Sequence, residues 1–260
     1  MPVLHYVLWI CNIALEVAVP FLMAWKRHYR TFPAIFLYLV INLLQAVVVY
    51  AVYLRKGYNS WPAFWTYWIS QGVVVLARWT AVSELCRLIL GQYKGIWALA
   101  WRVLAVLGGS AMLLALTLGG HNFVRIISTF DLSLEVSMGI VLLAFFFFAG
   151  YYKVVIENSL RTMAIAFCLY SLFRAFNDLV LQSFLRGYAS TWNLVDETTY
   201  FATLMLLGSA VYLFGSVSIP RVVLLPRSAY AEIAPQINAR LSLLNERLSE
   251  FLRSKQAGKA

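Results

Sequence analysis

The sequence predicts an all-α membrane protein: a bundle of seven transmembrane helices followed by a short cytoplasmic tail. Two properties of its 260 residues favour this fold, because 62% are hydrophobic and only 12% are charged, with a mean hydropathy of +0.75. Soluble domains carry about 25% charged residues and are about half apolar. The composition therefore excludes a soluble globular enzyme, a disordered chain and a nucleic-acid-binding module.

Seven apolar runs are long enough to cross a bilayer, since a helix needs roughly 20 mostly apolar residues to span the hydrocarbon. Every backbone amide must be satisfied within the bilayer, so each run is predicted to be helical. Pro33 and Pro62 lie where first helical turns should begin, and Pro20 is expected to kink the first helix. The runs cover approximately residues 3–25, 32–54, 63–90, 96–118, 126–152, 162–185 and 194–217. No basic residue precedes the first run, so we expect it to be retained rather than removed as a signal peptide.

The distribution of lysine and arginine between the connections predicts the orientation. One set of connections carries nine of them: Lys26, Arg27, Arg30, Arg87, Lys94, Lys153, Arg161, Arg221 and Arg227. The opposite set carries four: Arg55, Lys56, Arg125 and Arg186. Because positively charged connections stay in the cytoplasm, we expect the N-terminus outside and the C-terminus inside, in the plasma membrane. Residues 1–218 would form the membrane domain and residues 219–260 the cytoplasmic tail.

Two pairs of similar segments suggest an internal duplication. Residues 54–61 (LRKGYNSW) are similar to residues 185–192 (LRGYASTW), and residues 15–18 (LEVA) to residues 134–137 (LEVS). Two parallel three-helix units joined by the fourth helix, a 3+1+3 arrangement, would explain both pairs. The alternative is that such strings are common at membrane boundaries. The arrangement resembles that of small sugar transporters and, more loosely, of heptahelical receptors.

Ionisable side chains at membrane depth predict a polar core, because such residues usually face the bundle interior. Arg174 and Asp178 are spaced i,i+4 and are predicted to pair within one helix. Glu16, close to Pro20, then has Arg78 as its expected partner across the bundle. The candidate buried core comprises Glu16, Asn42, Gln45, Gln71, Arg78, Arg174, Asn177 and Asp178.

Two interpretations of this core stay open. Its side chains can be interhelical contacts that fix the helix register, or a site for a ligand, an ion or a proton in which two acids balance two bases. Glu84 and Arg87 are expected to pair at the inner boundary. Four further acids are expected to form a solvated outer rim: Asp131, Glu135, Asp196 and Glu197.

Motifs of familiar cofactor sites and hydrolases are missing from the sequence. The three cysteines have no Cys-x-x-Cys spacing, and no His-Glu-x-x-His or Gly-x-Ser-x-Gly string occurs. All six lysines lie in connections or in the tail, which excludes a retinal Schiff base within the membrane. We therefore expect neither a cofactor nor a metal, and the sequence argues more against an enzyme than for one.

The tail is predicted to contain an amphipathic helix over about residues 235–254. Apolar residues recur there at spacings of four, three, four and three: Ile237, Leu241, Leu244, Leu248 and Phe251. This a/d seam is just over two heptads long. It suits docking to a cytoplasmic protein, weak self-association, or binding flat on the membrane surface.

These features together predict a heptahelical membrane protein, sensor-like or a scaffold, that binds through its bundle core and docks through its tail. One alternative is a small 3+1+3 transporter of a small solute or ion, and a second is an accessory subunit of a larger membrane complex. The expected partners are the lipid bilayer and either a cytoplasmic protein or a second copy of the chain. No nucleic acid is expected.

The predicted orientation has a direct test. A reporter that is active only in the cytoplasm should work when fused after Ala260 and fail when inserted between Tyr58 and Asn59, because the charge bias of nine to four places these sites on opposite sides. A reporter that is active only outside the cytoplasm should give the reverse pattern. If the cytoplasmic reporter works at the Tyr58 site and fails at the C-terminus, every assigned side is inverted.

Overall fold

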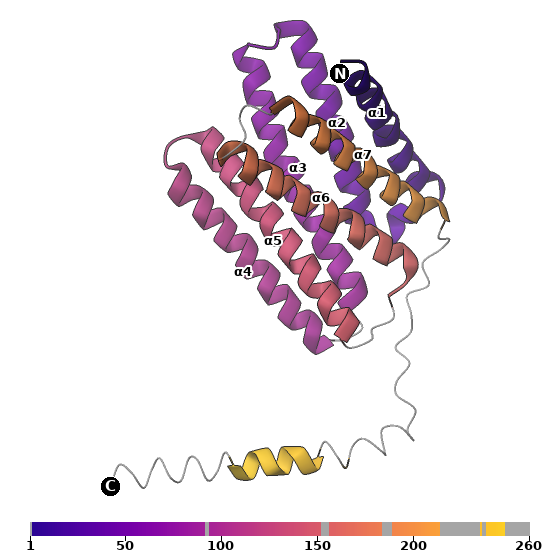
Figure 1. The fold of residues 1–260 in the computed structure, drawn as a ribbon, viewed down its shortest axis with the longest axis vertical. Coiled ribbons are helices and arrows are strands. Elements are labelled where there is room, and N and C mark those ends of the chain that lie inside the picture. The colour runs from indigo at the N-terminus through magenta and orange to yellow at the C-terminus, as the bar shows by residue number, and fades with distance from the viewer. Residues whose placement is uncertain are drawn as a thin grey trace. The chain divides into compact units, whose positions relative to one another are not determined.

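The computed structural model of the protein describes residues 2–91, 94–151, 156–183, 189–213, 235 and 238–247. These residues are 93% helical and contain no strand, which confirms the all-α prediction. The chain divides into two units, Met1–Ile219 and Pro220–Ala260. The first unit contains, in order, α1 (Pro2–Trp25), the 3-10 helix η1 (His28–Arg30), α2 (Pro33–Lys56), α3 (Trp61–Leu90), α4 (Lys94–Gly119), α5 (Phe123–Tyr151), α6 (Asn158–Ser183) and α7 (Ala189–Leu213) (Figure 1).

Each of the seven predicted runs falls on one of the helices α1 to α7, and α1 continues through Pro20. Among the described residues, four helical segments are long and apolar enough to cross a membrane: His5–Trp25, Pro33–Lys56, Gly95–Gly119 and Phe123–Tyr151. The helices α3, α6 and α7 are less apolar, and they carry Arg78, Arg174 and Asp196. The apolar helices support the prediction of a membrane protein.

Six of the long helices form a closed ring. In this ring α1 contacts α2, α2 contacts α3, α3 contacts α5, α5 contacts α6, α6 contacts α7, and α7 returns to α1. The helix α4 lies outside the ring, against α5 and α3 (Figure 1). Two parallel three-helix units joined by α4 would give this order of contacts, with the contact of α3 with α5 corresponding to that of α7 with α1.

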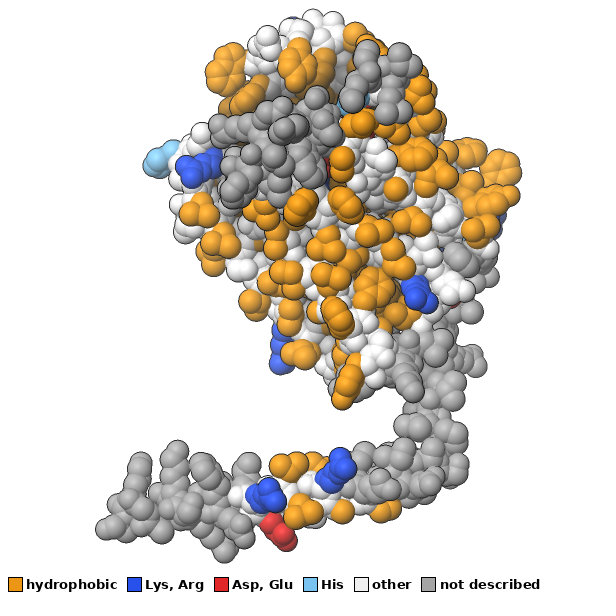
Figure 2. Space-filling view, in the orientation of Figure 1, with side chains coloured by type: hydrophobic (Ala, Val, Ile, Leu, Met, Phe, Trp, Pro, Cys, Tyr) orange, Lys and Arg blue, Asp and Glu red, His pale blue; other side chains and the backbone are white. Residues whose placement is uncertain are grey.

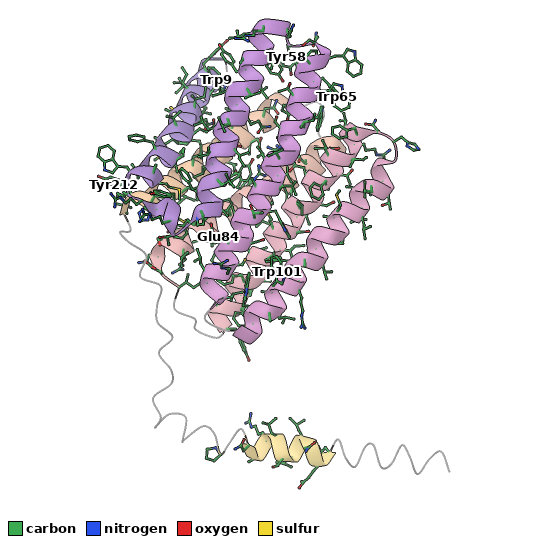
Figure 3. All side chains as sticks on the ribbon, turned by 180° about the vertical axis from the view of Figure 1, so that it is seen from behind. Trp9, Tyr58, Trp65, Glu84, Trp101 and Tyr212 are labelled. Carbon is green, nitrogen blue, oxygen red and sulfur yellow. The ribbon has the colours of Figure 1, made fainter. Side chains whose placement is uncertain are left out.

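The helix α3 is central to the bundle, since it contacts α2, α4, α5 and α6. One of its faces is buried along most of its length, through Val74, Ala81, Leu85 and Ile89. These positions recur at helical spacing, as expected for a face that packs against neighbours. Figure 3 shows Tyr58 and Trp65 at one end of the bundle and Glu84 toward the other.

Large apolar side chains cover the outward faces of the bundle. On α4, Leu99, Trp101, Val106 and Leu113 are all exposed, and Figure 2 shows hydrophobic side chains across a whole face of the molecule. Soluble monomers rarely expose apolar patches larger than a few hundred Å². A surface of this kind fits contact with a lipid bilayer.

The start of α2 is capped by a side chain from α3. The first amides of a helix have no partner within that helix, and here Oε2 of Glu84 accepts hydrogen bonds from the amides of Ala34 and Ile35 at 2.9 and 3.0 Å. Pro33, which precedes them, has no amide hydrogen to satisfy. The predicted pair of Glu84 with Arg87 is therefore wrong: among the described residues Arg87 makes no ion pair within 4.0 Å of Glu84, whose carboxylate is directed at α2.

A lysine side chain lies at the C-terminal end of α7. Nζ of Lys26, in the connection after α1, donates to the carbonyl oxygen of Tyr212 at 2.6 Å and lies 4.8 Å from the centre of its ring. A positive charge at a helix C-terminus is stabilised by the unpaired carbonyls and the helix dipole. Lys26 therefore ties the end of α1 to the end of α7.

Part of the predicted tail helix lies within the described residues. Residues 238–247 are helical, and Leu241 and Leu244 are exposed there. The other seam residues, Ile237, Leu248 and Phe251, lie outside the described residues.

We expect Glu84→Ala to destabilise the bundle by about 1–3 kcal/mol, because two backbone amides in the first turn of α2 lose their hydrogen-bond acceptor. Glu84→Gln keeps one carbonyl oxygen and should retain most of the stability. Thermal unfolding can be followed by a thiol-reactive dye, since Cys86 and Cys168 are buried. Glu246→Ala, on the exposed helical stretch 238–247, is the control. An unchanged melting temperature for Glu84→Ala would contradict the capping role.

Candidate functional site

The most deeply buried charges of the bundle are Arg78 on α3 and Glu135 on α5, which are 2% and 0% exposed. They form an ion pair. The guanidinium of Arg78 also lies 4.7 Å from the ring centre of Tyr170 and 5.6 Å from that of Tyr38, a cation–π geometry. The expected pairing of Arg78 with Glu16 is therefore wrong, and Glu135 does not belong to a solvated rim.

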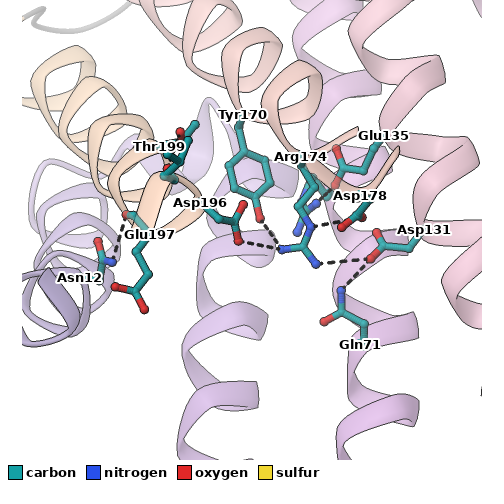
Figure 4. Close-up of polar contacts among 12 residues, drawn as sticks. Asn12, Gln71, Asp131, Glu135, Tyr170, Arg174, Asp178, Asp196, Glu197 and Thr199 are labelled. Atoms are coloured by element: carbon teal, nitrogen blue, oxygen red, sulfur yellow. Dashed lines mark hydrogen bonds and ion pairs between the residues drawn. The ribbon is translucent and has the colours of Figure 1, made fainter. Parts of the chain in front are cut away.

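Arg174 on α6 is surrounded by three carboxylates from three helices. Its nitrogens lie 3.8 Å from Asp131 on α5, 3.9 Å from Asp178 on α6 and 3.9 Å from Asp196 on α7 (Figure 4). It also donates to the Tyr170 hydroxyl at 3.4 Å. The predicted i,i+4 pair with Asp178 exists, but it is one of three contacts rather than a self-contained pair.

Two glutamines connect this cluster to α2. Nε2 of Gln71 donates to Asp131 at 3.0 Å, and Nε2 of Gln45 donates to Oε1 of Gln71 at 3.2 Å. Asp131 is almost fully buried. It lies eight residues after the start of α5 at Phe123, and its burial shows that its side chain faces the bundle rather than solvent, contrary to the predicted rim.

Glu16 on α1 has neutral partners. Its Oε1 accepts hydrogen bonds from the Tyr200 hydroxyl at 2.6 Å and from Nδ2 of Asn42 at 3.1 Å. Asn42 and Tyr200 are also 2.7 Å apart, so the three side chains join α1, α2 and α7. In the described part of the chain, no lysine or arginine lies within 4.0 Å of this carboxylate.

Glu197 on α7 contacts two residues of α1. Its carboxylate lies 2.9 Å from Nδ1 of His5, and its backbone carbonyl accepts from Asn12 at 3.4 Å (Figure 4). Glu197 and Asp196 are each about one-third exposed, at 35% and 33%. The predicted outer rim thus holds in part for these two acids, and is wrong for Asp131 and Glu135.

A polar cavity of about 210 Å³ lies between these groups. Its charged lining residues come from four helices: Glu16, Arg78, Arg174, Asp196 and Glu197. The cavity is large enough for several waters, each taking about 30 Å³, or for a small polar group. Oδ1 of Asn12, which also lines it, is buried and has no hydrogen-bond partner among the described residues. Buried polar atoms are normally satisfied, so this oxygen marks a place for a donor from outside the protein.

The charges around the cavity do not balance. Two guanidinium groups, Arg78 and Arg174, and three carboxyl groups, Glu16, Asp196 and Glu197, line it. Three further acids, Asp131, Glu135 and Asp178, lie behind the lining as partners of the arginines, and His5 contacts Glu197. The expectation of two acids against two bases is therefore wrong, because it left out the acids of α5 and α7. Unpaired charge is costly in a poorly solvated interior, so the excess of acid favours protons or a bound cation. No three His, Cys, Asp or Glu side chains of the described residues are placed to hold a metal ion.

Most of the predicted core residues lie together. Five of them line the cavity: Glu16, Asn42, Gln71, Arg78 and Arg174. Gln45 and Asp178 are one contact away, whereas Asn177 is buried on α6 and its Oδ1 has no hydrogen-bond partner in the described ranges.

Sequence reasoning missed the two cavity tyrosines. Tyr170 precedes Arg174 by four residues, a spacing that places both on one face of a helix and was a usable signal. Tyr200 had no such signal, since its partners lie on other helices. Comparison with protein-family models, with curated proteins and with solved structures finds no match to this chain.

The three-carboxylate cluster makes Arg174 far less replaceable than Asp178. Asp178→Asn leaves Arg174 with two carboxylates and should change stability by less than about 1 kcal/mol. Arg174→Leu leaves three acids without their cation and should cost about 3–5 kcal/mol. The double variant Arg174→Leu with Asp178→Leu should stay destabilised, because Asp131 and Asp196 remain unpaired. Recovery of the melting temperature in the double variant would show a self-contained pair instead.

Proposed function

We propose that the protein is a heptahelical, sensor-like membrane protein that binds a positively charged ligand in the polar cavity of its bundle. The observation that carries this proposal is the excess of acid at the cavity: three carboxyl groups line it with two guanidinium groups, and both guanidinium groups are already paired with further acids. Charged residues inside a membrane domain are functional candidates by default, because their burial is costly.

A cation fits this cavity better than an anion does. The guanidinium of Arg78 is engaged by Glu135, and that of Arg174 by three acids. Glu16, in contrast, accepts only from neutral donors. A bound ammonium group would supply the opposite charge that Glu16 lacks, and the Tyr200 ring beside it offers a cation–π contact.

The proposal includes seven membrane spans, with the N-terminus outside and the C-terminus inside. It is supported by the seven long helices and by the nine-to-four distribution of Lys and Arg. The lower apolar content of α3, α6 and α7 suits helices that present charges to a shared interior, since only part of such a helix faces lipid.

In this proposal the tail passes the binding signal on by docking to another protein. Residues 219–260 would form a cytoplasmic segment, in which the exposed Leu241 and Leu244 lie on the helical stretch 238–247. An apolar seam on an isolated helix suits docking to a second protein, or to another copy of the chain.

A transporter of a small cation is the second candidate. It is favoured by the closed ring of six helices with α4 outside, which is the contact order that two parallel three-helix units would give. Uptake of the cation by vesicles that contain the purified protein would favour this role over a purely sensing one.

The ligand proposal is tested with choline as the cationic probe and acetate as the anionic one. Choline should bind the purified protein and raise its melting temperature, whereas acetate should do neither. Glu16→Gln keeps the side-chain shape and an acceptor for Tyr200 and Asn42, but removes the charge. It should weaken choline binding about tenfold or more, because the quaternary ammonium of choline has no N–H to donate and binds the carboxylate by charge, and a close charge pair contributes about 1.5 kcal/mol or more.

The matched control is Glu157→Gln, which changes a carboxyl group outside the cavity and should leave choline binding unchanged. Preferential binding of acetate, or choline binding that is indifferent to Glu16→Gln, would overturn the proposal.

A further inference from the structure

The polar cavity adjoins a larger groove of about 830 Å³, a volume in the range of about 300–1,000 Å³ that is typical of ligand sites. Six residues line both spaces: Asn12, Glu16, Asn42, Gln71, Glu197 and Tyr200. Movement of these shared side chains would join the cavity to the groove. Beyond these six residues the groove is mostly apolar.

The groove opens sideways, between α1 and α2. Trp9 and Ile13 line it from α1, and Val47 and Tyr50 from α2. All four are exposed on the surface of the bundle, Trp9 by 51% and Val47 by 57%. This surface is the apolar one that fits contact with lipid, so the mouth of the groove faces hydrocarbon rather than water.

The groove follows α2. It extends from Asn42, which bonds to Glu16, to Tyr53. These two residues are eleven positions apart, about 16 Å of helix. One end is polar and acidic, whereas aliphatic side chains and the rings of Tyr50, Tyr53 and Tyr67 line most of the rest, so the space is matched to a molecule with a charged head and a hydrocarbon tail.

We propose that the ligand is a single-chain cationic amphiphile that enters from the bilayer between α1 and α2. Its ammonium head lies in the polar cavity beside Glu16 and Tyr200, and its tail lies along α2 in the groove. The inference rests on the proposed function, since it names the class of the ligand that the acidic cavity binds. Charge complementarity selects a cationic head, because the acids that line or support the cavity outnumber its arginines.

Lateral entry also explains why the polar groups of the site are shared between α1, α2 and α7. Glu16, Asn42 and Tyr200 lie at the inner end of the groove and bond to one another. In the absence of a head group they satisfy each other across the opening. A ligand that arrives from the lipid would meet these three groups first and reach Arg78 and Arg174 last.

The test uses the whole protein in phosphatidylcholine nanodiscs and two photoreactive probes of equal length. One is a dodecylammonium with a diazirine on its tail, and the other is the corresponding dodecyl carboxylate. The ammonium probe should label peptides of α1 and α2 at least several-fold more than peptides of the outlying α4, and unlabelled dodecylammonium should compete. The carboxylate probe should label all lipid-facing helices to similar extents.

A pair of variants on α2 supplies the matched control. Ala46 lines the groove, whereas Val48 is exposed and does not. Ala46→Trp should fill the groove and abolish the selective labelling, and Val48→Trp should leave it intact. Choline, which has no tail, should bind Ala46→Trp as well as it binds the parent protein.

The outcomes separate this inference from the proposed function. If choline binds but the ammonium probe labels every helix alike, the polar cavity binds a cation and the amphiphile is excluded. If the carboxylate labels α1 and α2 as selectively as the ammonium does, the groove is a general lipid site and the inference is overturned. If neither choline nor dodecylammonium binds, the proposed function and the inference fail together.

Discussion

Burying two guanidinium groups in a bundle with an apolar exterior constrains the rest of the structure. Arg78 is almost fully buried and the Arg174 side chain is three-quarters buried, so each needs acids, and a single helix does not supply enough of them. Arg78 takes Glu135 from α5, and Arg174 takes acids from α5, α6 and α7. The helices that close one half of the ring are therefore held in register by charge, because a slip of one turn would separate a buried ion from its partner.

The fold was accessible from the sequence because membrane helices are specified by composition, one segment at a time. The partners of the buried charges were not, because partner choice depends on which helix faces are adjacent. The i,i+4 spacing of Arg174 and Asp178 predicts a contact within α6 but is silent about Asp131 and Asp196. The sequence predicts a solvated rim that includes Glu135, but the side of the helix on which a residue lies decides its burial, and Glu135 lies on the side of α5 that faces Arg78.

The excess of acid is likewise not evident from the sequence, because it depends on which helix faces are adjacent. Glu16 and Arg78 are the charges that stand out in apolar runs, and they suggest a neutral pair. In the structure Glu16 accepts hydrogen bonds from neutral donors, whereas Arg78 contacts Glu135 and two aromatic rings. The interior is thus polarised, with its cations satisfied on the side of α5 and α6, and an under-neutralised carboxylate on the side of α1 and α2. The proposed binding site rests on that asymmetry rather than on any one residue.

The position of α4 outside the ring has a consequence for how such a chain can arise. A unit of three helices ends on the opposite side of the membrane from where it begins, so a second copy joined directly to it would be inserted upside down. One extra crossing restores the starting side, and it need not take part in the interior. The helix α4 packs against α5 and α3 on the outside of the ring, which suits a linking helix in such a duplication: it would cross the membrane without lining the space that the ring encloses. The polar side chains inside the ring therefore place no direct constraint on the sequence of α4.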